Sequence, residues 1–245
     1  MSIDSVLTLV SAVSEAVVVV LLLTRKTWRI LPIFSLYILW AMISDLVAFY
    51  FQSHEVFANY LVFYTIMMTV DAILQFTVLV ELGWSVLRPI RSSLPRGALI
   101  ALTVVVAVAG LVIWPLAGMT TPEPLTSQGA LVFHLNQTFA ILRVVCFLVM
   151  ASFSQLLSIG WRDRELQVAT GLGFYSIISL LVTMLDSHHT SDNQSHMLHE
   201  AVSLSYLGTL AYWVVSFAAK EYQRQEFSPQ MRDFLLLMGG GARKP

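Results

Sequence analysis

Apolar residues gather in seven long runs along the chain, and short polar stretches separate the runs. The runs cover residues 6–23, 32–51, 60–84, 99–116, 131–157, 170–185 and 198–219. A stretch of about 20 predominantly apolar residues is enough for a helix to cross the hydrocarbon core of a bilayer. The pattern therefore predicts an all-α fold, with a bundle of seven membrane-spanning helices over residues 1–220 and a tail over residues 221–245.

The composition agrees with a polytopic membrane protein. Hydrophobic residues make up 57% of the 245 residues and charged residues only 12%, and the mean hydropathy is +0.74. Soluble domains are less apolar, and charged residues make up about 25% of them. The single cysteine, Cys146, lies inside the fifth run, so an intramolecular disulfide is excluded.

The positions of lysine and arginine predict the orientation of the helices. Of the 14 cationic residues, all but Arg143 follow the first, third, fifth or seventh run. The other three connections, QSHEVFAN, AGMTTPEPLTSQ and DSHHTSDNQSHM, contain neither lysine nor arginine. Because short loops rich in these cations stay on the cytoplasmic side during insertion, we expect the amino terminus outside and the carboxyl terminus in the cytoplasm.

The third run carries a stripe of polar residues. At about 100° per residue, Tyr64, Asp71 and Gln75 fall on one face of a helix. Ionisable side chains within a membrane-spanning helix face protein or water rather than lipid. The stripe is therefore either a row of structural hydrogen bonds between helices or one wall of a path for a ligand or an ion.

Other runs place polar residues at similar depths. The first run carries Glu15, the second Asp45, and the fifth both Asn136 and Arg143. A lone guanidinium at the bilayer centre costs at least about 2.5–3.5 kcal/mol, so we expect Arg143 to pair with a buried acid. Depth along the helices favours Asp71 as the partner, with Glu15 as the nearest competitor.

Three acids against one arginine leave an excess of carboxyl groups. These groups are either protonated or in contact with water or a cation, and the second case indicates transport or sensing. The fourth run contains nothing more polar than Thr103, so we expect its helix outside the polar core. The predicted ligand or ion cavity is lined by Glu15, Asp45, Tyr64, Asp71, Gln75, Asn136 and Arg143.

All six histidines lie in the predicted outer loops or at outer helix ends. Imidazole and carboxylate groups are ligands of zinc and copper, so the cluster suggests a metal site at the outer face. The alternative is a titratable polar loop without a ligand. The candidate metal ligands are His188, His189, His196 and His199.

The tail contains the signals of a short helix. Ser228 is a capping residue, Pro229 suits the first turn, and three glycines from Gly239 end the element. One face would be apolar, formed by Met231, Phe234, Leu235 and Met238. Such a helix lies on the membrane surface or binds a cytoplasmic partner.

Seven helices with an external amino terminus resemble rhodopsins and G-protein-coupled receptors in topology. The seventh run has no interior lysine for a retinal Schiff base, and the chain has neither an Asp-Arg-Tyr nor an Asn-Pro-x-x-Tyr motif. The stretches WRDRELQVATGLGFYSIISLL and EFSPQMRDFLLLMGGGAR resemble small bacterial inner-membrane proteins with seven helices. That resemblance implies the fold and an inner-membrane location, without an activity.

The predicted function is that of a receptor-like membrane sensor, and the alternative is a proton- or cation-coupled transporter of small molecules. No Walker loop, nucleophile elbow, kinase signature or Cys-x-x-Cys motif indicates an enzyme. The expected partners are the lipid bilayer, a small ligand or ion, and a cytoplasmic partner of the tail helix. No nucleic acid is expected, and outer-face zinc or copper is the one candidate cofactor.

Overall fold

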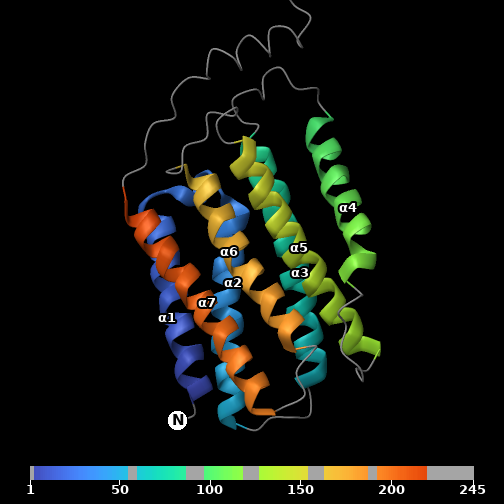
Figure 1. Cartoon of the computed structure of the whole chain (residues 1–245). Coiled ribbons are helices and arrows are strands. Elements are labelled where there is room, and N and C mark those ends of the chain that lie inside the picture. Colours follow the sequence, from blue (N-terminus) through green and yellow to red (C-terminus); the bar gives the residue numbers. More distant parts are fainter. Residues whose placement is uncertain are drawn as a thin grey trace, which may run out of the picture.

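The computed structural model describes residues 3–54, 60–86, 97–117, 127–153, 163–186 and 192–219. These residues form seven α-helices and one short 3-10 helix, without a strand among them (Figure 1). The α-helices are α1 (Ile3–Thr24), α2 (Pro32–His54), α3 (Tyr60–Val86), α4 (Ala98–Ala117), α5 (Ser127–Phe153), α6 (Arg164–Asp186) and α7 (Asp192–Ala218). The 3-10 helix η1 (Thr27–Arg29) lies between α1 and α2.

Each of the seven α-helices contains an apolar stretch long enough to cross a membrane. The outward-facing side chains are large and hydrophobic, and Leu111 and Val215 are 73% and 72% exposed. Such side chains are stable next to lipid and costly in water. The predicted seven-helix membrane protein is therefore confirmed at the level of the fold.

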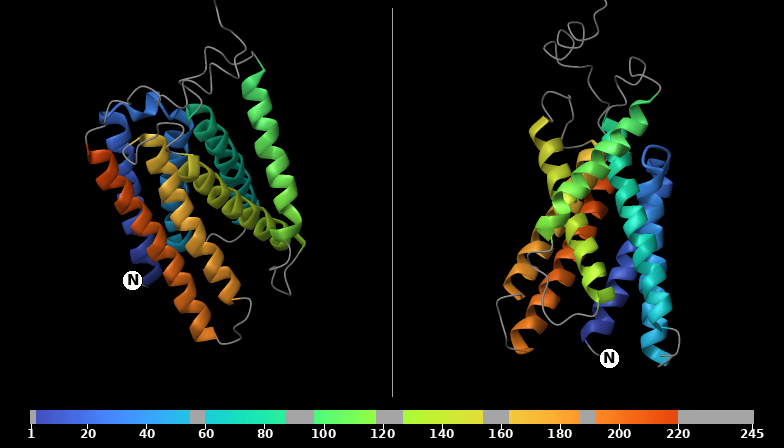
Figure 2. Two further views of the ribbon diagram at one scale, coloured as in Figure 1. Left: turned by 45° about the horizontal axis from the view of Figure 1, so that its top comes forward. Right: turned by 90° about the vertical axis from the view of Figure 1, so that its right-hand side faces the viewer.

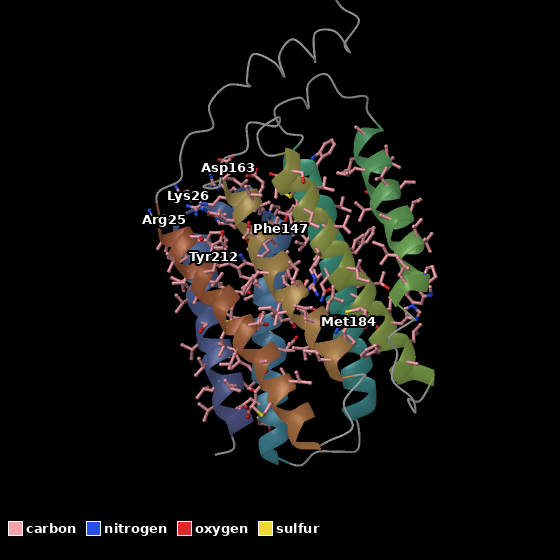
Figure 3. The ribbon with its side chains drawn as sticks, viewed as in Figure 1. Arg25, Lys26, Phe147, Asp163, Met184 and Tyr212 are labelled. Atoms are coloured by element: carbon pink, nitrogen blue, oxygen red, sulfur yellow. The ribbon has the colours of Figure 1, made fainter. Side chains whose placement is uncertain are left out.

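Successive helices run in opposite directions, as Figure 1 shows. Consequently α1, α3, α5 and α7 all end at the same side of the bundle, which we call the basic end because the cationic connections follow these helices. Figure 3 shows Arg25, Lys26 and Asp163 at this end. We call the other side, where α1 and α7 begin, the opposite end.

Helix α4 lies at the edge of the bundle. It packs mainly on α5, with fewer contacts to α3, and the left view of Figure 2 shows it at the periphery. Only Ile113 and Ala117 of its side chains are buried. The prediction that the fourth helix lies outside the polar core is confirmed.

An apolar core fills the bundle toward the basic end. The ring of Phe34 packs edge-on against Trp213 at a centroid distance of 5.1 Å and against Phe217 at 6.2 Å. Rings in this arrangement gain electrostatic as well as hydrophobic stabilisation. We call this cluster the basic-end core, and its fully or almost fully buried members include Val18, Leu22, Leu31, Phe34, Val78, Leu82, Leu210, Trp213 and Phe217.

A carboxylate from α3 caps the first turn of α2 at the basic end. Glu81 accepts hydrogen bonds from the backbone N–H groups of Ile33 (2.8 Å) and Phe34 (2.7 Å). The first N–H groups of a helix have no partner within the helix, and Pro32 at the first position has none to donate. Glu81 therefore satisfies two donors that would otherwise be buried without a partner.

The last turn of α7 is capped by two arginines. Arg164 donates to the carbonyl oxygens of Ser216 (2.8 Å) and Ala219 (3.0 Å), and Arg25 donates to that of Ala218 (2.6 Å). Cations at a helix carboxyl end stabilise its unpaired carbonyl groups. Arg164 is only 2% exposed and is the first residue of α6. This helix therefore begins six residues before the apolar run that predicted it.

Candidate functional site

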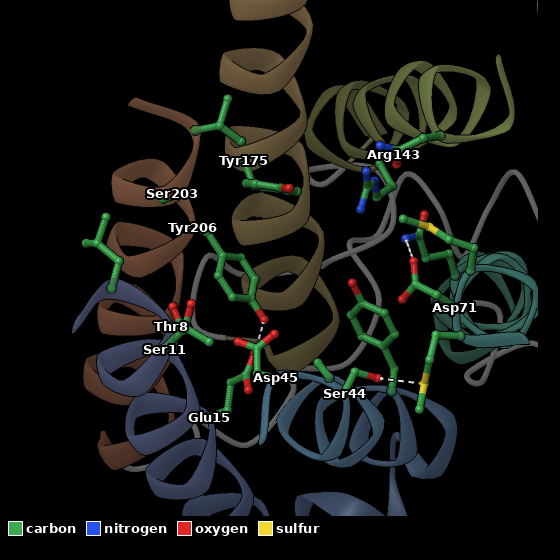
Figure 4. Close-up of a pocket in the computed structure, with 18 residues that line it drawn as sticks. Thr8, Ser11, Glu15, Ser44, Asp45, Asp71, Arg143, Tyr175, Ser203 and Tyr206 are labelled. Atoms are coloured by element: carbon green, nitrogen blue, oxygen red, sulfur yellow. Dashed lines mark hydrogen bonds between the residues drawn. The ribbon is translucent and has the colours of Figure 1, made fainter. Parts of the chain in front are cut away.

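A polar pocket of about 480 Å³ lies between α1, α2, α3, α5, α6 and α7. Helix α4 contributes no side chain to it. Six of the predicted cavity residues line this one pocket, namely Glu15, Asp45, Asp71, Gln75, Asn136 and Arg143 (Figure 4). The structure thus brings together side chains from separate helices, and their role as a ligand or ion site stays a prediction.

Most of the side chains that line the pocket lie toward the opposite end of the bundle, and Tyr37 on α2 is the lining residue nearest the basic end of its helix. Its lining begins at Leu7 on α1, Met67 on α3 and Val202 on α7, and these helices reach the basic end about two and a half to three and a half turns after the last lining residue. Between the pocket and the basic end lie the apolar side chains of the basic-end core. The pocket is therefore separated from the basic end by close-packed hydrophobic residues.

One wall of the pocket holds an acidic pair. Glu15 is 0% exposed and accepts a hydrogen bond from the hydroxyl of Tyr206, while its Oε2 atom has no hydrogen-bond partner among the described residues. Asp45 from α2 lies within electrostatic range of Glu15. Figure 4 shows both carboxyl groups beside the Tyr206 hydroxyl.

The facing wall holds the buried arginine. Arg143 is 4% exposed, and its Cζ atom lies 5.5 Å from the ring centroid of Tyr175, a distance at which a cation is attracted to the ring. Asp71 accepts a hydrogen bond of 2.5 Å from Nε2 of Gln75, one turn along α3. Asp71 and Arg143 interact electrostatically across this wall.

The predicted direct pairing of Arg143 with Asp71 is wrong in one respect. Within the described part of the chain, no salt bridge joins the two side chains, and the Arg143 Nε atom has no hydrogen-bond partner. The reason is local, since Gln75 takes one oxygen of Asp71 and the guanidinium lies over Tyr175. The two charges offset each other across a gap rather than in contact.

Three tyrosines connect the two walls, although none of them was predicted to line the cavity. Tyr175 packs edge-on against Tyr206 at a centroid distance of 5.5 Å. Tyr37 lies within electrostatic range of Glu15, Asp71 and Arg143. Tyrosine is tolerated in lipid, at the interface and in the interior, so its position along a helix carries little signal.

Several predicted site residues are not tested by the structure. The side chains of Tyr64, His196 and His199 and all of His188 and His189 lie outside the described residues. The described residues contain no group of three or more His, Cys, Asp or Glu side chains that could hold a metal ion. The outer-face metal site therefore remains a prediction, as does the amphipathic helix of the tail, which lies beyond residue 219.

Two smaller spaces adjoin the bundle. A space of about 110 Å³ between α3 and α5 shares Asp71, Gln75 and Asn136 with the polar pocket and extends it sideways. A groove of about 340 Å³ between α3, α4 and α5 is almost wholly apolar and includes Cys146. Only the first of these spaces continues the polar lining.

No protein-family model, curated protein or solved structure matches this chain. The resemblance to small bacterial inner-membrane proteins therefore rests on the sequence alone. The structure establishes an integral membrane protein with seven candidate spanning helices and a polar pocket at their centre.

Proposed function

We propose that this protein is a receptor-like membrane sensor whose polar pocket binds a small ligand. The observation that carries the proposal is the one-sided position of the pocket. Six helices line it, most of its lining lies toward the opposite end, and the basic-end core lies between it and the basic end. A sensor needs a binding site accessible from one side, whereas a transporter needs access from each side in turn.

Helix α7 is the element best placed to carry a signal. Its residue Tyr206 donates to Glu15 in the pocket, and its last carbonyl groups are bound by Arg25 and Arg164 at the basic end. A ligand that competes for Glu15 would change the contacts of Tyr206 and so favour another position of α7. The tail that follows α7 would then move relative to the bundle.

The proposed orientation places the basic end in the cytoplasm and the pocket toward the outside. The distribution of lysine and arginine supports this orientation. Of the 14 such residues, all except Arg143 lie in or next to the connections and tail at the basic end. We propose the bacterial inner membrane as the location, on the resemblance of the α6 and tail sequences. A carboxyl-terminal fusion to alkaline phosphatase should be inactive in bacteria, and an active fusion would reverse the orientation.

Cation-coupled transport is the second candidate. Three carboxyl groups face one guanidinium in the pocket, and a surplus of acids within a membrane is typical of proton and cation pathways. The two functions differ in access to the pocket, so labelling can separate them.

The test is cysteine labelling from each side of the membrane. Ser11→Cys, in a chain with Cys146→Ser, places the one thiol on the pocket wall. In proteoliposomes of known orientation, a membrane-impermeant maleimide should label this thiol from the opposite end only. Ala12→Cys is the matched control, because Ala12 is 5% exposed and does not line the pocket. Labelling of Ser11→Cys from both sides would favour the transporter and contradict the sensor.

A further inference from the structure

We propose that the ligand of the pocket is a small organic amine whose ammonium group binds between Glu15 and Asp45. This inference rests on the proposed function, because it names the chemical class that the same pocket would bind. It is carried by the hydrogen bonding and charge of the pocket wall formed by α1, α2 and α7 (Figure 4).

The hydrogen bonding of Glu15 favours a ligand that donates. One of its oxygens accepts from Tyr206, and the other is buried without a hydrogen-bond partner among the described residues, although Glu15 lines the pocket. A buried carboxylate oxygen without a donor is costly. An ammonium group supplies three donors, enough for Glu15 Oε2 and Asp45 together. A carboxylate or phosphate ligand would bring further acceptors and like charge.

The distribution of charge in the pocket favours a cation. Asp71 faces Arg143 on the other wall, so the only guanidinium among the lining residues is already offset. Glu15 and Asp45 lie within electrostatic range of each other, and no cationic side chain lines their wall. When both carboxyl groups are ionised, they repel each other strongly in this poorly solvated site. A cationic ligand relieves this repulsion, whereas a neutral ligand does not.

The aromatic side chains of the pocket suit an organic cation. Tyr37, Tyr175 and Tyr206 all line the pocket. Tyrosine rings attract cations through their faces, and Arg143 already uses Tyr175 in this way. Aromatic rings beside acidic groups can therefore bind an organic ammonium group.

A metal ion fits the wall less well than an amine. The described residues provide no group of three or more His, Cys, Asp or Glu side chains that could hold a metal ion. The volume of about 480 Å³ instead suits a small organic molecule, since ligand pockets occupy about 300–1,000 Å³.

A second acceptor indicates that a diamine would bind more tightly than a monoamine. The Oε1 atom of Gln75 is also buried without a hydrogen-bond partner in the described structure, and it lies beside Asp71 on the facing wall. A second ammonium group could donate to this oxygen. The two unsatisfied acceptors thus lie on the two walls of one pocket.

The test uses the full-length protein in detergent and four probes of the same chain length. Isothermal titration calorimetry at constant pH and ionic strength compares 1,4-diaminobutane, butylamine, 1-butanol and butyrate. We expect saturable binding of 1,4-diaminobutane, binding of butylamine that is at least threefold weaker, and no binding of the alcohol or the acid. Binding of 1-butanol or butyrate as tight as that of butylamine would overturn the inference.

Variants locate the site. Glu15→Gln and Asp45→Asn should each weaken 1,4-diaminobutane binding at least tenfold, and Glu200→Gln should leave it unchanged, because Glu200 lies on α7 without lining the pocket. If Glu15→Gln fails to fold, Asp45→Asn decides, since Asp45 makes no hydrogen bond to hold the bundle together within the described residues. Unchanged binding in Asp45→Asn would overturn the inference.

The labelling experiment and the titration fail independently. If neither amine binds while Ser11→Cys is labelled from one side only, the ligand class is wrong and the sensor proposal stands. If the amines bind and the thiol is labelled from both sides, the ligand class stands and the sensor proposal is overturned.

Discussion

Gly171 of α6 lies against Trp213 of α7, and replacing it with alanine should destabilise the bundle. A Cβ atom added at Gly171 would lie 2.3 Å from Nε1 and 2.6 Å from Cε2 of Trp213. Trp213 is 1% exposed, donates from Nε1 to the Gln167 carbonyl at 3.2 Å and packs against Phe34. The indole therefore cannot move without disturbing the basic-end core.

The expected size combines three contributions. Overpacking a well-packed core costs about 1–3 kcal/mol, and loss of the Trp213 hydrogen bond costs about 1 kcal/mol. Replacing glycine with alanine within a helix returns about 1 kcal/mol. Gly171→Ala should therefore lower the free energy of unfolding by about 1–3 kcal/mol.

Gly208→Ala is the matched control, because a Cβ atom added to this residue of α7 meets nothing within 4 Å. It should gain about 1 kcal/mol from helix propensity alone. The assay is unfolding by SDS in mixed micelles, followed by far-UV circular dichroism. Equal stability of the two variants would contradict the expected clash, because it would mean that the indole moves aside at no cost.

Two further variants test the polar contacts. Glu81→Gln replaces one of the two oxygens that cap α2 with an amide nitrogen, so one buried N–H group of Ile33 or Phe34 loses its acceptor. The same SDS assay should show a loss of about 1–3 kcal/mol in the free energy of unfolding. A stability equal to that of the parent protein would count against the capping role. Arg143→Met should destabilise the protein, because it leaves the charge of Asp71 without its electrostatic partner. Adding Asp71→Asn should recover part of the lost stability. If the losses of the two single variants add to within about 0.5 kcal/mol in the double variant, the two side chains are not coupled.

The membrane environment explains why so much of the fold was predictable. A spanning helix must be long and apolar, so the seven runs correspond to α1 through α7 with shifts mainly at their ends. Polar side chains must face inward for the same reason. This rule brought Glu15, Asp45 and Arg143 into one pocket and placed α4 outside it.

The partners of the polar side chains were harder to predict, because they depend on atoms that periodicity does not describe. Glu81 is bound by backbone groups of α2, which are invisible in a pattern of side chains. Asp71 was expected to contact Arg143, yet Gln75 on its own helix is the nearer donor. The position of a residue along its helix predicts its depth in the membrane. It does not predict which neighbouring group the end of its side chain will contact.

Arg164 explains why the start of α6 was misplaced, and it also limits how α7 can move. In the sequence it is one of the cations that orient the protein, and such residues are ordinarily solvated. In the structure its guanidinium is buried against the end of α7 and donates to two carbonyl groups there. Arg25, from the connection after α1, donates to a third carbonyl group at the end of α7. Because α7 is held at this end by two charged side chains from other parts of the bundle, a change at Tyr206 in the pocket cannot simply slide α7 along its axis. On the proposed function, a change at Tyr206 displaces the carboxyl end of α7 only if these bonds break.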